Sequence, residues 1–168
     1  MNNIVLIGMP GVGKSTVGVI LAKMMGFHFI DADILIQEQE NRLLCDIIEQ
    51  DGVEGFLEIE NRVNSQINVT DSVIATGGSV IYGKEAMEHL KKTGTIVYLK
   101  LSYETLNKRL EDIKGRGVVF KDGQGLKDIY AERIPLYEKY AELVVDQEGL
   151  NVEETIEKIL EAIKWEKR

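Results

Sequence analysis

Short apolar runs alternate along the chain with longer segments in which apolar residues recur every three or four positions. The short runs have the length of strands, and the recurring pattern is typical of amphipathic helices with one face turned to a core. The predicted strands cover 3–8, 27–31, 72–76, 95–101 and 142–146. The predicted helices cover 14–26, 32–40, 53–67, 84–94, 102–113, 126–141 and 151–168.

Alternating elements of this kind indicate an α/β fold, with a five-stranded parallel sheet flanked by helices on both faces. In such sheets, ligands bind beyond the carboxyl ends of the strands. That rule selects residues 8–16, 31–33, 76–79 and the loops near 115 and 147 as the candidate site. No internal repeat or linker interrupts the pattern, so residues 1–168 are expected to form one domain.

Three local features lead to expectations about packing. Cys45 lies in an apolar helical pattern and is expected to be a small buried side chain. Pro135 is expected to kink or divide the helix over 126–141, because proline lacks a backbone N–H. The buried face of the first helix is expected to consist of Val17, Ile20, Leu21 and Met24.

The composition narrows the classes of partner. The chain has 168 residues, a formal net charge of −8 and a pI of about 4.9. An acidic surface repels nucleic-acid phosphates, and no apolar run approaches the roughly 18 residues of a membrane span, so neither partner is expected. The single cysteine allows no intrachain disulfide, and the first residues read as a strand rather than a secretion signal. A cytoplasmic location is therefore expected.

A phosphate-binding loop connects the first predicted strand to the first predicted helix. Gly8, Gly13, Lys14 and Ser15 match the pattern G-x-x-x-x-G-K-[ST]. Glycines let several backbone N–H groups point at one centre, and the positive end of the helix adds to the attraction for phosphate. Lys14 would reach the β- and γ-phosphates, and the Ser15 hydroxyl would bind Mg²⁺. The predicted nucleotide-binding residues of the loop are Gly11, Val12, Gly13, Lys14, Ser15 and Thr16.

A dinucleotide-binding loop is the closest competing interpretation of this segment. Gly11 and Gly13 supply G-x-G, and an acidic residue follows about twenty residues later. However, Thr16 occupies the third glycine position, and Lys14 and Ser15 would have no role. A nucleoside triphosphate explains more of the segment.

Further motifs extend over nearly the whole chain. They are DADILI (31–36), DIIEQDGVEGFLEIE (46–60), ATGGSV (75–80), GRG (115–117) and AERIPLYEKYA (131–141). Together with the phosphate loop they resemble the shikimate kinase family. The resemblance implies a three-layer P-loop kinase fold with a mobile lid at about 113–125. It also implies ATP and Mg²⁺ as cofactors, phosphorylation of a shikimate hydroxyl in aromatic amino acid biosynthesis, and a monomer that binds a small hydroxy acid or hydroxy amino acid.

The resemblance assigns roles on the nucleotide side. Lys14 and Ser15 match the phosphate and metal positions, and Asp31 matches the acid that supports hydrated Mg²⁺. Arg109 resembles the arginine that stacks on adenine, and Arg116 resembles the lid arginine that reaches the transferring phosphate. In plainer interpretations, Asp31 caps the next helix and the two arginines are solvated charges.

On the acceptor side, Asp33 matches the carboxylate that hydrogen-bonds the accepting hydroxyl and is a candidate for taking its proton. Gly77 and Gly78 match the glycine loop that lets the backbone approach the substrate, and Arg133 resembles the arginine that grips the substrate carboxylate. A helix cap is the plainer interpretation of Asp33, and an exposed helical side chain that of Arg133. The predicted catalytic residues are Lys14, Asp33 and Arg116.

The chain departs from the family pattern in three places. Leu57 stands where the motif F-R-x-x-E has arginine, Thr76 stands for the first of three glycines, and Gly117 stands where the lid has proline. The missing arginine matters most, because in the family it shares the substrate carboxylate with the arginine that matches Arg133. A charge-assisted hydrogen bond is worth roughly 1.5–3 kcal/mol, so its loss would weaken a carboxylate ligand roughly ten- to a hundredfold.

Glu60 thereby loses its expected cationic neighbour and becomes a candidate for binding an ammonium group. One acceptor hypothesis is shikimate, held by Arg133 with help from Arg62 or Arg116, and overall resemblance favours it. The other is a hydroxylated amino acid such as homoserine, with its carboxylate on Arg133 and its ammonium near Glu60. A regulatory nucleotide-binding module without kinase activity would not need Asp33 and Arg133. A nucleoside monophosphate kinase would need more arginines near the acceptor site.

Overall fold

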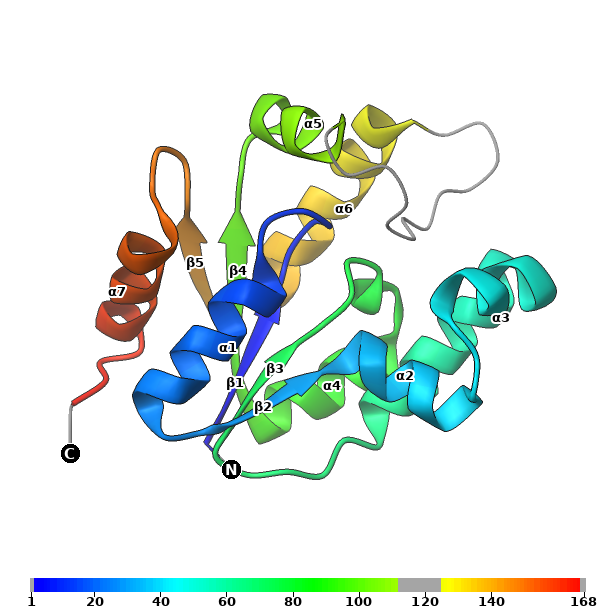
Figure 1. The fold of residues 1–168 in the computed structure, drawn as a ribbon, viewed down its shortest axis with the longest axis horizontal. Helices are drawn as coiled ribbons and strands as arrows, with labels where there is room; N and C mark the ends of the chain where they lie inside the picture. Colours follow the sequence, from blue (N-terminus) through cyan, green and yellow to red (C-terminus); the bar gives the residue numbers. More distant parts are fainter. Residues whose placement is uncertain (1, 112–124, 167–168) are drawn as a thin grey trace.

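The centre of the protein is a five-stranded parallel sheet, whose strands are labelled in Figure 1. The structure is a computed structural model that describes residues 2–111 and 125–166. Arg116 and nearly all of the predicted lid lie outside the described residues. The strands are β1 (Asn3–Ile7), β2 (His28–Asp31), β3 (Ser72–Ala75), β4 (Gly94–Lys100) and β5 (Leu143–Asp146).

The five strands lie in the order β2-β3-β1-β4-β5, and each neighbouring pair is parallel. Val5 of β1 lies opposite Ile74 of β3 and Ile96 of β4. All residues of β1 and β3 are buried, as expected for strands with helices on both faces. The predicted α/β class and the five strands are confirmed, with each strand end within one residue of its prediction.

Helices form a layer on each face of the sheet, so the fold has three layers (Figure 1). They are α1 (Lys14–Met25), α2 (Ala32–Glu40), α3 (Leu44–Ser65), α4 (Lys84–Thr93), α5 (Tyr103–Glu111), α6 (Leu126–Tyr140) and α7 (Val152–Ala162), with the short 3-10 helix η1 (Val80–Tyr82). α1 and α7 cover one face, and α4 and α6 cover the other. α2 directly follows the carboxyl end of β2 and packs against α3.

The buried face of α1 differs from the predicted one. Val17 and Leu21 are buried, but Ile20 and Met24 are exposed. The helix instead turns Gly18 towards β2, where a Cβ on Gly18 would lie only 2.8 Å from the Phe29 ring. The lack of a side chain at this position allows close packing on the sheet and rotates the apolar face.

The helix α3 is longer than predicted and contains a kink. The helical pattern around Cys45 continues into the helix predicted over 53–67, and Gly52 has φ 74° and ψ 176° between the two parts. The prediction that Cys45 is buried is wrong, because the first part of α3 buries Ile47 and leaves Cys45 exposed. Pro135 does not divide α6, which is continuous from Leu126 to Tyr140.

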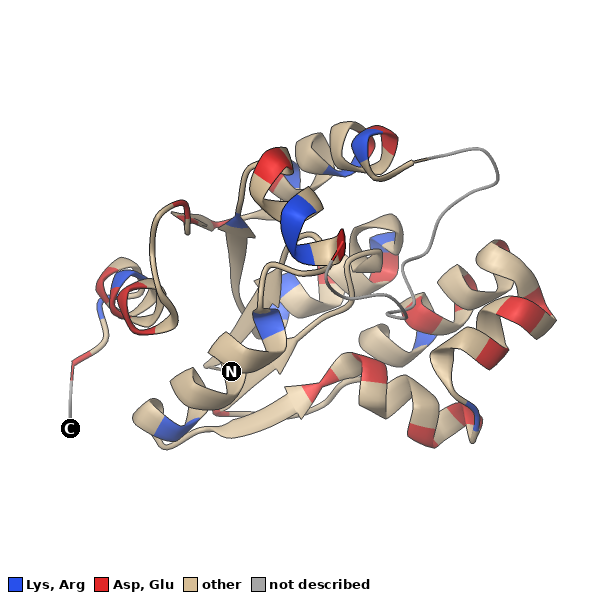
Figure 2. Ribbon diagram, turned by 45° about the horizontal axis from the view of Figure 1, so that its top comes forward, with Lys and Arg blue, Asp and Glu red and all other residues tan. Residues whose placement is uncertain are grey.

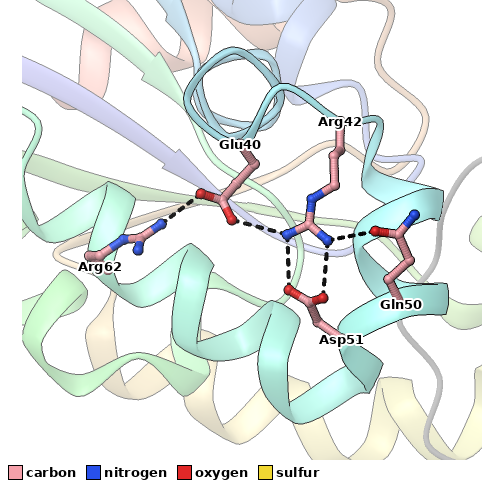
Figure 3. Close-up of polar contacts among 5 residues, drawn as sticks. All are labelled: Glu40, Arg42, Gln50, Asp51 and Arg62. Carbon is pink, nitrogen blue, oxygen red and sulfur yellow. Dashed lines mark hydrogen bonds and ion pairs between the residues drawn. The ribbon is translucent and has the colours of Figure 1, made fainter.

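Charged side chains join α2 to both parts of α3 (Figure 3). Arg42 Nη2 lies 3.1 Å from Glu40 Oε1 and 2.9 Å from Asp51 Oδ2. Arg42 Nη1 also donates to Gln50 Oε1 at 3.0 Å. Arg62 Nη2 lies 2.9 Å from the other oxygen of Glu40. Because Asp51 precedes the kink and Arg62 follows it, these contacts fix the two parts of α3 relative to α2.

Acidic residues recur along α2, α3 and α7, as Figure 2 shows. The excess of acidic over basic residues gives the chain its formal net charge of −8. Within residues 2–111 and 125–166, no helix has the length and apolar character that crossing a bilayer requires.

Candidate active site

The phosphate loop lies between β1 and α1, at the carboxyl end of the central strand. Gly8, Gly11 and Gly13 have φ values of 150°, 89° and 92°, which other residues rarely adopt. A Cβ on Gly8 would also lie 2.7 Å from the carbonyl oxygen of Leu99 in β4. The loop therefore depends on glycine both for its curvature and for its close approach to the sheet.

Lys14, the first residue of α1, curls back over this loop. Its Nζ donates to the carbonyl oxygens of Gly8 at 2.6 Å and Met9 at 2.9 Å. Only 8% of the residue is exposed. The positive charge is thus held at the centre of the loop, where a phosphate would meet both the ammonium and the start of α1.

Ser15 and Asp31 place two oxygen ligands next to the phosphate loop. Ser15 Oγ donates to Asp31 Oδ2 at 3.0 Å. Asp31 Oδ1 accepts from the backbone N–H groups of Asp33 at 3.0 Å and Ile34 at 3.3 Å, so Asp31 is also the cap of α2. A hydroxyl and a carboxylate suit Mg²⁺, a hard cation that binds few protein oxygens and retains waters.

Two side chains, one from α5 and one from the segment after β5, contact the carbonyl groups of the phosphate loop. Arg109 Nη1 donates to the Gly11 carbonyl at 3.2 Å, which brings the predicted adenine-stacking residue beside the loop. The buried Gln147 Nε2 donates to the Val12 carbonyl at 3.1 Å. Gln147 was not singled out from the sequence, although its position directly after the last predicted strand is a usable signal. Thr16 lies in the first turn of α1.

Asp33 and Glu60 converge on Gly77, which follows β3. A Cβ on Gly77 would lie 2.8 Å from Asp33 Oδ1 and 2.8 Å from Glu60 Oε2. The two carboxylates come from α2 and α3, which are separate in sequence from the glycine loop. Residue 77 must therefore lack a side chain for these three segments to meet.

The carboxylate of Asp33 lies beside Gly77 and also interacts electrostatically with Lys14 of the phosphate loop. Burial and the Asp31 carboxylate raise the pKa of Asp33, and the Lys14 ammonium opposes them. A raised pKa makes the carboxylate a better proton acceptor. The cap of α2 is Asp31, so the plainer interpretation does not apply to Asp33.

Glu60 is the most deeply buried carboxylate of the site, with 2% of the residue exposed. Its Oε1 accepts from Ser79 Oγ at 2.6 Å, and its Oε2 has no hydrogen-bond partner among the described residues. Burial raises the pKa of Glu60 from 4.5 to about 7, against the opposing effects of Ser79, Arg133 and Lys14. Sequence reasoning did not identify Ser79.

Arg133 is buried in the site, so its interpretation as an exposed helical arginine is wrong. Only 2% of it is exposed, and its guanidinium carbon lies 5.5 Å from the centre of the Tyr82 ring. A Cβ on Gly78 would lie 2.9 Å from Arg133 Nη1. Tyr137, one turn further along α6, donates from its hydroxyl to the Gly78 carbonyl at 2.5 Å. This anchor of the glycine loop was also missed in the sequence.

Leu57 has an apolar environment. It packs against the small second cluster of the protein, whose buried members include Ile36 and Val63. The residue at this position therefore supplies packing between α2 and α3 and no charge.

Comparison with known proteins shows the family to which the chain belongs. A sequence model described as shikimate kinase matches residues 10–164. The chain belongs to the shikimate kinase family. A shikimate kinase from Thermodesulfovibrio yellowstonii is 38% identical over 95% of this chain and 94% of its own. One from Clostridium botulinum strain Okra is 39% identical over 98% of this chain and 97% of its own.

The fold comparison leads to the same family. A shikimate kinase from Acinetobacter baumannii, solved in complex with shikimate, superposes with a TM-score of 0.87. It is 31% identical, and the match covers 98% of this chain and 93% of that one. The protein is thus a phosphotransferase of the shikimate kinase family with an alcohol as acceptor. These relatives do not favour an amino-acid kinase or a regulatory module.

Proposed function

We propose that the protein transfers the γ-phosphate of ATP to a hydroxyl of shikimate with Mg²⁺ as cofactor. The observation that carries the proposal is the position of Asp33, whose carboxylate lies beside Gly77 on the acceptor side and is influenced by Lys14 of the phosphate loop. The related enzyme solved with shikimate supports the acceptor.

On the nucleotide side, residues 11–16 hold the phosphates and Arg109 contacts the adenine. Lys14 leaves the carbonyls of Gly8 and Met9 to neutralise charge on the transferred group. Ser15 and Asp31 would hold Mg²⁺, with the hydroxyl of one and the carboxylate of the other as oxygen donors. The metal supplies further neutralisation of the phosphate oxygens when it is bound.

On the acceptor side, Arg133 binds the carboxylate of the substrate, and the backbone at Gly77 and Gly78 lies against its ring. Asp33 aligns the accepting hydroxyl with the γ-phosphorus and takes its proton. The new bond from the hydroxyl oxygen to phosphorus replaces the bond to the bridging oxygen, and ADP leaves. Holding the reactants in line accounts for most of the catalysis.

The remaining assignments belong to the same proposal. Residues 1–168 form one domain with a lid at about 113–125, from which Arg116 reaches the transferring phosphate. The enzyme acts as a monomer in the cytoplasm, without nucleic acid or membrane as partner.

The test is a coupled assay of ADP release with shikimate as acceptor. Saturable turnover is expected, and Asp33→Asn should reduce kcat at least about a hundredfold while circular dichroism shows an unchanged fold. The matched control is Glu38→Gln, which removes a carboxylate from an exposed position of the same helix. Failure of shikimate to stimulate ADP release would refute the acceptor. Near-normal turnover by Asp33→Asn would remove Asp33 from the mechanism.

A further inference from the structure

Arg133, which the proposed function assigns to the substrate carboxylate, lies against the ring of Tyr82. Its guanidinium carbon is 5.5 Å from the centre of the ring, within the roughly 6 Å at which an aromatic face attracts a cation. On another side of the same guanidinium, a Cβ on Gly78 would lie 2.9 Å from Nη1. The segment after β3 therefore provides both the space for the guanidinium, at Gly78, and an aromatic face for it, at Tyr82.

Backbone hydrogen bonds hold Tyr82 close to the glycine loop. Tyr82 is the last residue of η1, and its N–H donates to the Ser79 carbonyl at 3.0 Å. At the start of η1, the Val80 N–H donates to the Gly77 carbonyl at 3.2 Å. The same short helix packs against α6, which carries Arg133. The position of Tyr82 is thus fixed relative to both the glycine loop and Arg133.

The hydroxyl of Tyr82 also faces Arg133, with a defined direction. It donates to Glu132 Oε1 at 2.8 Å. A phenol has one hydrogen to donate, so the lone pairs of its oxygen remain for the guanidinium. Burial and the Glu132 carboxylate raise the pKa of Tyr82, and a hydrogen bond with Arg133 opposes them. Tyr82 therefore stays protonated at neutral pH and meets Arg133 with both its ring and its hydroxyl oxygen.

Leu57 makes the orientation of Arg133 more important in this chain. An apolar residue stands there in place of the arginine of the family pattern, so one guanidinium is left for the substrate carboxylate. A guanidinium binds a carboxylate most strongly through two parallel hydrogen bonds, which fix the relative orientation of the two groups. A single flexible side chain keeps that orientation only when neighbouring groups hold it.

We infer that Tyr82 is a positioning residue for the acceptor, which orients Arg133 so that this single arginine binds the substrate carboxylate through two hydrogen bonds. The inference rests on the proposed function, in which Arg133 binds that carboxylate, and it adds the residue that sets the selectivity for a charged acid. Tyr82 acts through Arg133 rather than on the acceptor, because its hydroxyl hydrogen is donated to Glu132.

The test compares shikimate with its primary amide, which has a neutral group of nearly the same shape, in the coupled assay of ADP release. The natural protein should have the higher kcat/KM for the acid. In Tyr82→Phe, which removes one oxygen atom and keeps the ring, the ratio of the two kcat/KM values should fall about three- to tenfold. Tyr82→Leu removes the ring as well and should lower the ratio further. The ratio should persist in the matched control Tyr140→Phe, which changes a half-buried tyrosine at the end of α6.

Two further measurements separate positioning from a structural role. The effect of Tyr82→Phe should appear in the KM for shikimate and leave the KM for ATP unaltered. Arg133→Lys keeps the positive charge but lacks the planar fork, so in this background Tyr82→Phe should no longer change the ratio.

Three results would overturn the inference and leave the proposed function intact. They are equal use of the acid and the amide by the natural protein, a ratio that Tyr82→Phe leaves unchanged, and an equal fall of the ratio in Tyr140→Phe. An undiminished effect of Tyr82→Phe in the Arg133→Lys background would show that Tyr82 does not act through Arg133, and would also overturn it. A lack of stimulation of ADP release by shikimate would instead refute the proposed function.

Discussion

Replacing Glu60 by glutamine should stabilise the fold at neutral pH, although the residue belongs to the active site. Burial raises the pKa of Glu60 from 4.5 to about 7. Each unit between the two values corresponds to about 1.4 kcal/mol, so the ionised carboxylate costs the fold roughly 3 kcal/mol. The folded protein retains the proton that the unfolded chain has lost between these pH values. Stability therefore falls as pH rises from about 4.5 to about 7 and levels off above that range.

Glutamine removes this penalty, since it carries no charge and its Oε1 can still accept from Ser79 Oγ. The assay is urea unfolding between pH 5 and pH 8, followed by the fluorescence of Trp165, whose ring lies edge-on to Phe27 at 5.6 Å. The stability of Glu60→Gln minus that of the natural protein should grow with pH by up to roughly 3 kcal/mol.

Asp33 titrates in both proteins and its carboxylate acts on Glu60, so the difference reports the two carboxylates as a coupled pair. Glu58→Gln, at an exposed position of α3, should give a difference that does not depend on pH. A difference for Glu60→Gln that stays constant across the range, or that falls with rising pH, would refute the reasoning.

Two further substitutions test the two halves of the site. Lys14→Ala should reduce kcat at least about a hundredfold, because it removes the charge held over the phosphate loop, and ADP release by a variant with unchanged circular dichroism measures this. Unimpaired turnover would exclude Lys14 from charge neutralisation. Gly77→Ala places a Cβ 2.8 Å from both Asp33 Oδ1 and Glu60 Oε2, so kcat/KM for the acceptor should fall about a hundredfold. Calorimetry should find ATP binding unchanged in that variant, and a loss of ATP binding instead would contradict an acceptor-side role.

The elements that could be predicted from the sequence are those whose signal is local. Each strand is one short apolar run, and each strand end lies within one residue of its prediction. The phosphate loop combines glycines at positive φ with Lys14 and Ser15, and all of these lie within one short segment. A pattern in consecutive residues is sufficient for such features, because the structure they form closes on itself within that segment.

The features that the sequence did not indicate depend on partners far apart in the chain. The rotation of α1 follows from the contact between Gly18 and Phe29, and the helical periodicity of α1 contains no trace of it. Tyr137 of α6 anchors the glycine loop at Gly78, whereas the sequence indicates only Arg133 of this helix as a site residue. The burial of Arg133 depends on packing of α6 against the sheet, which no local pattern describes.

The exposed position of Cys45 has a practical consequence. The chain has one cysteine, and its thiol lies on the surface of the first part of α3, across the kink at Gly52 from Glu60. A maleimide dye would attach to a single place in the natural sequence, with no other thiol to mutate away. Its emission would give a direct optical record of whether this helix moves when nucleotide or acceptor enters the site.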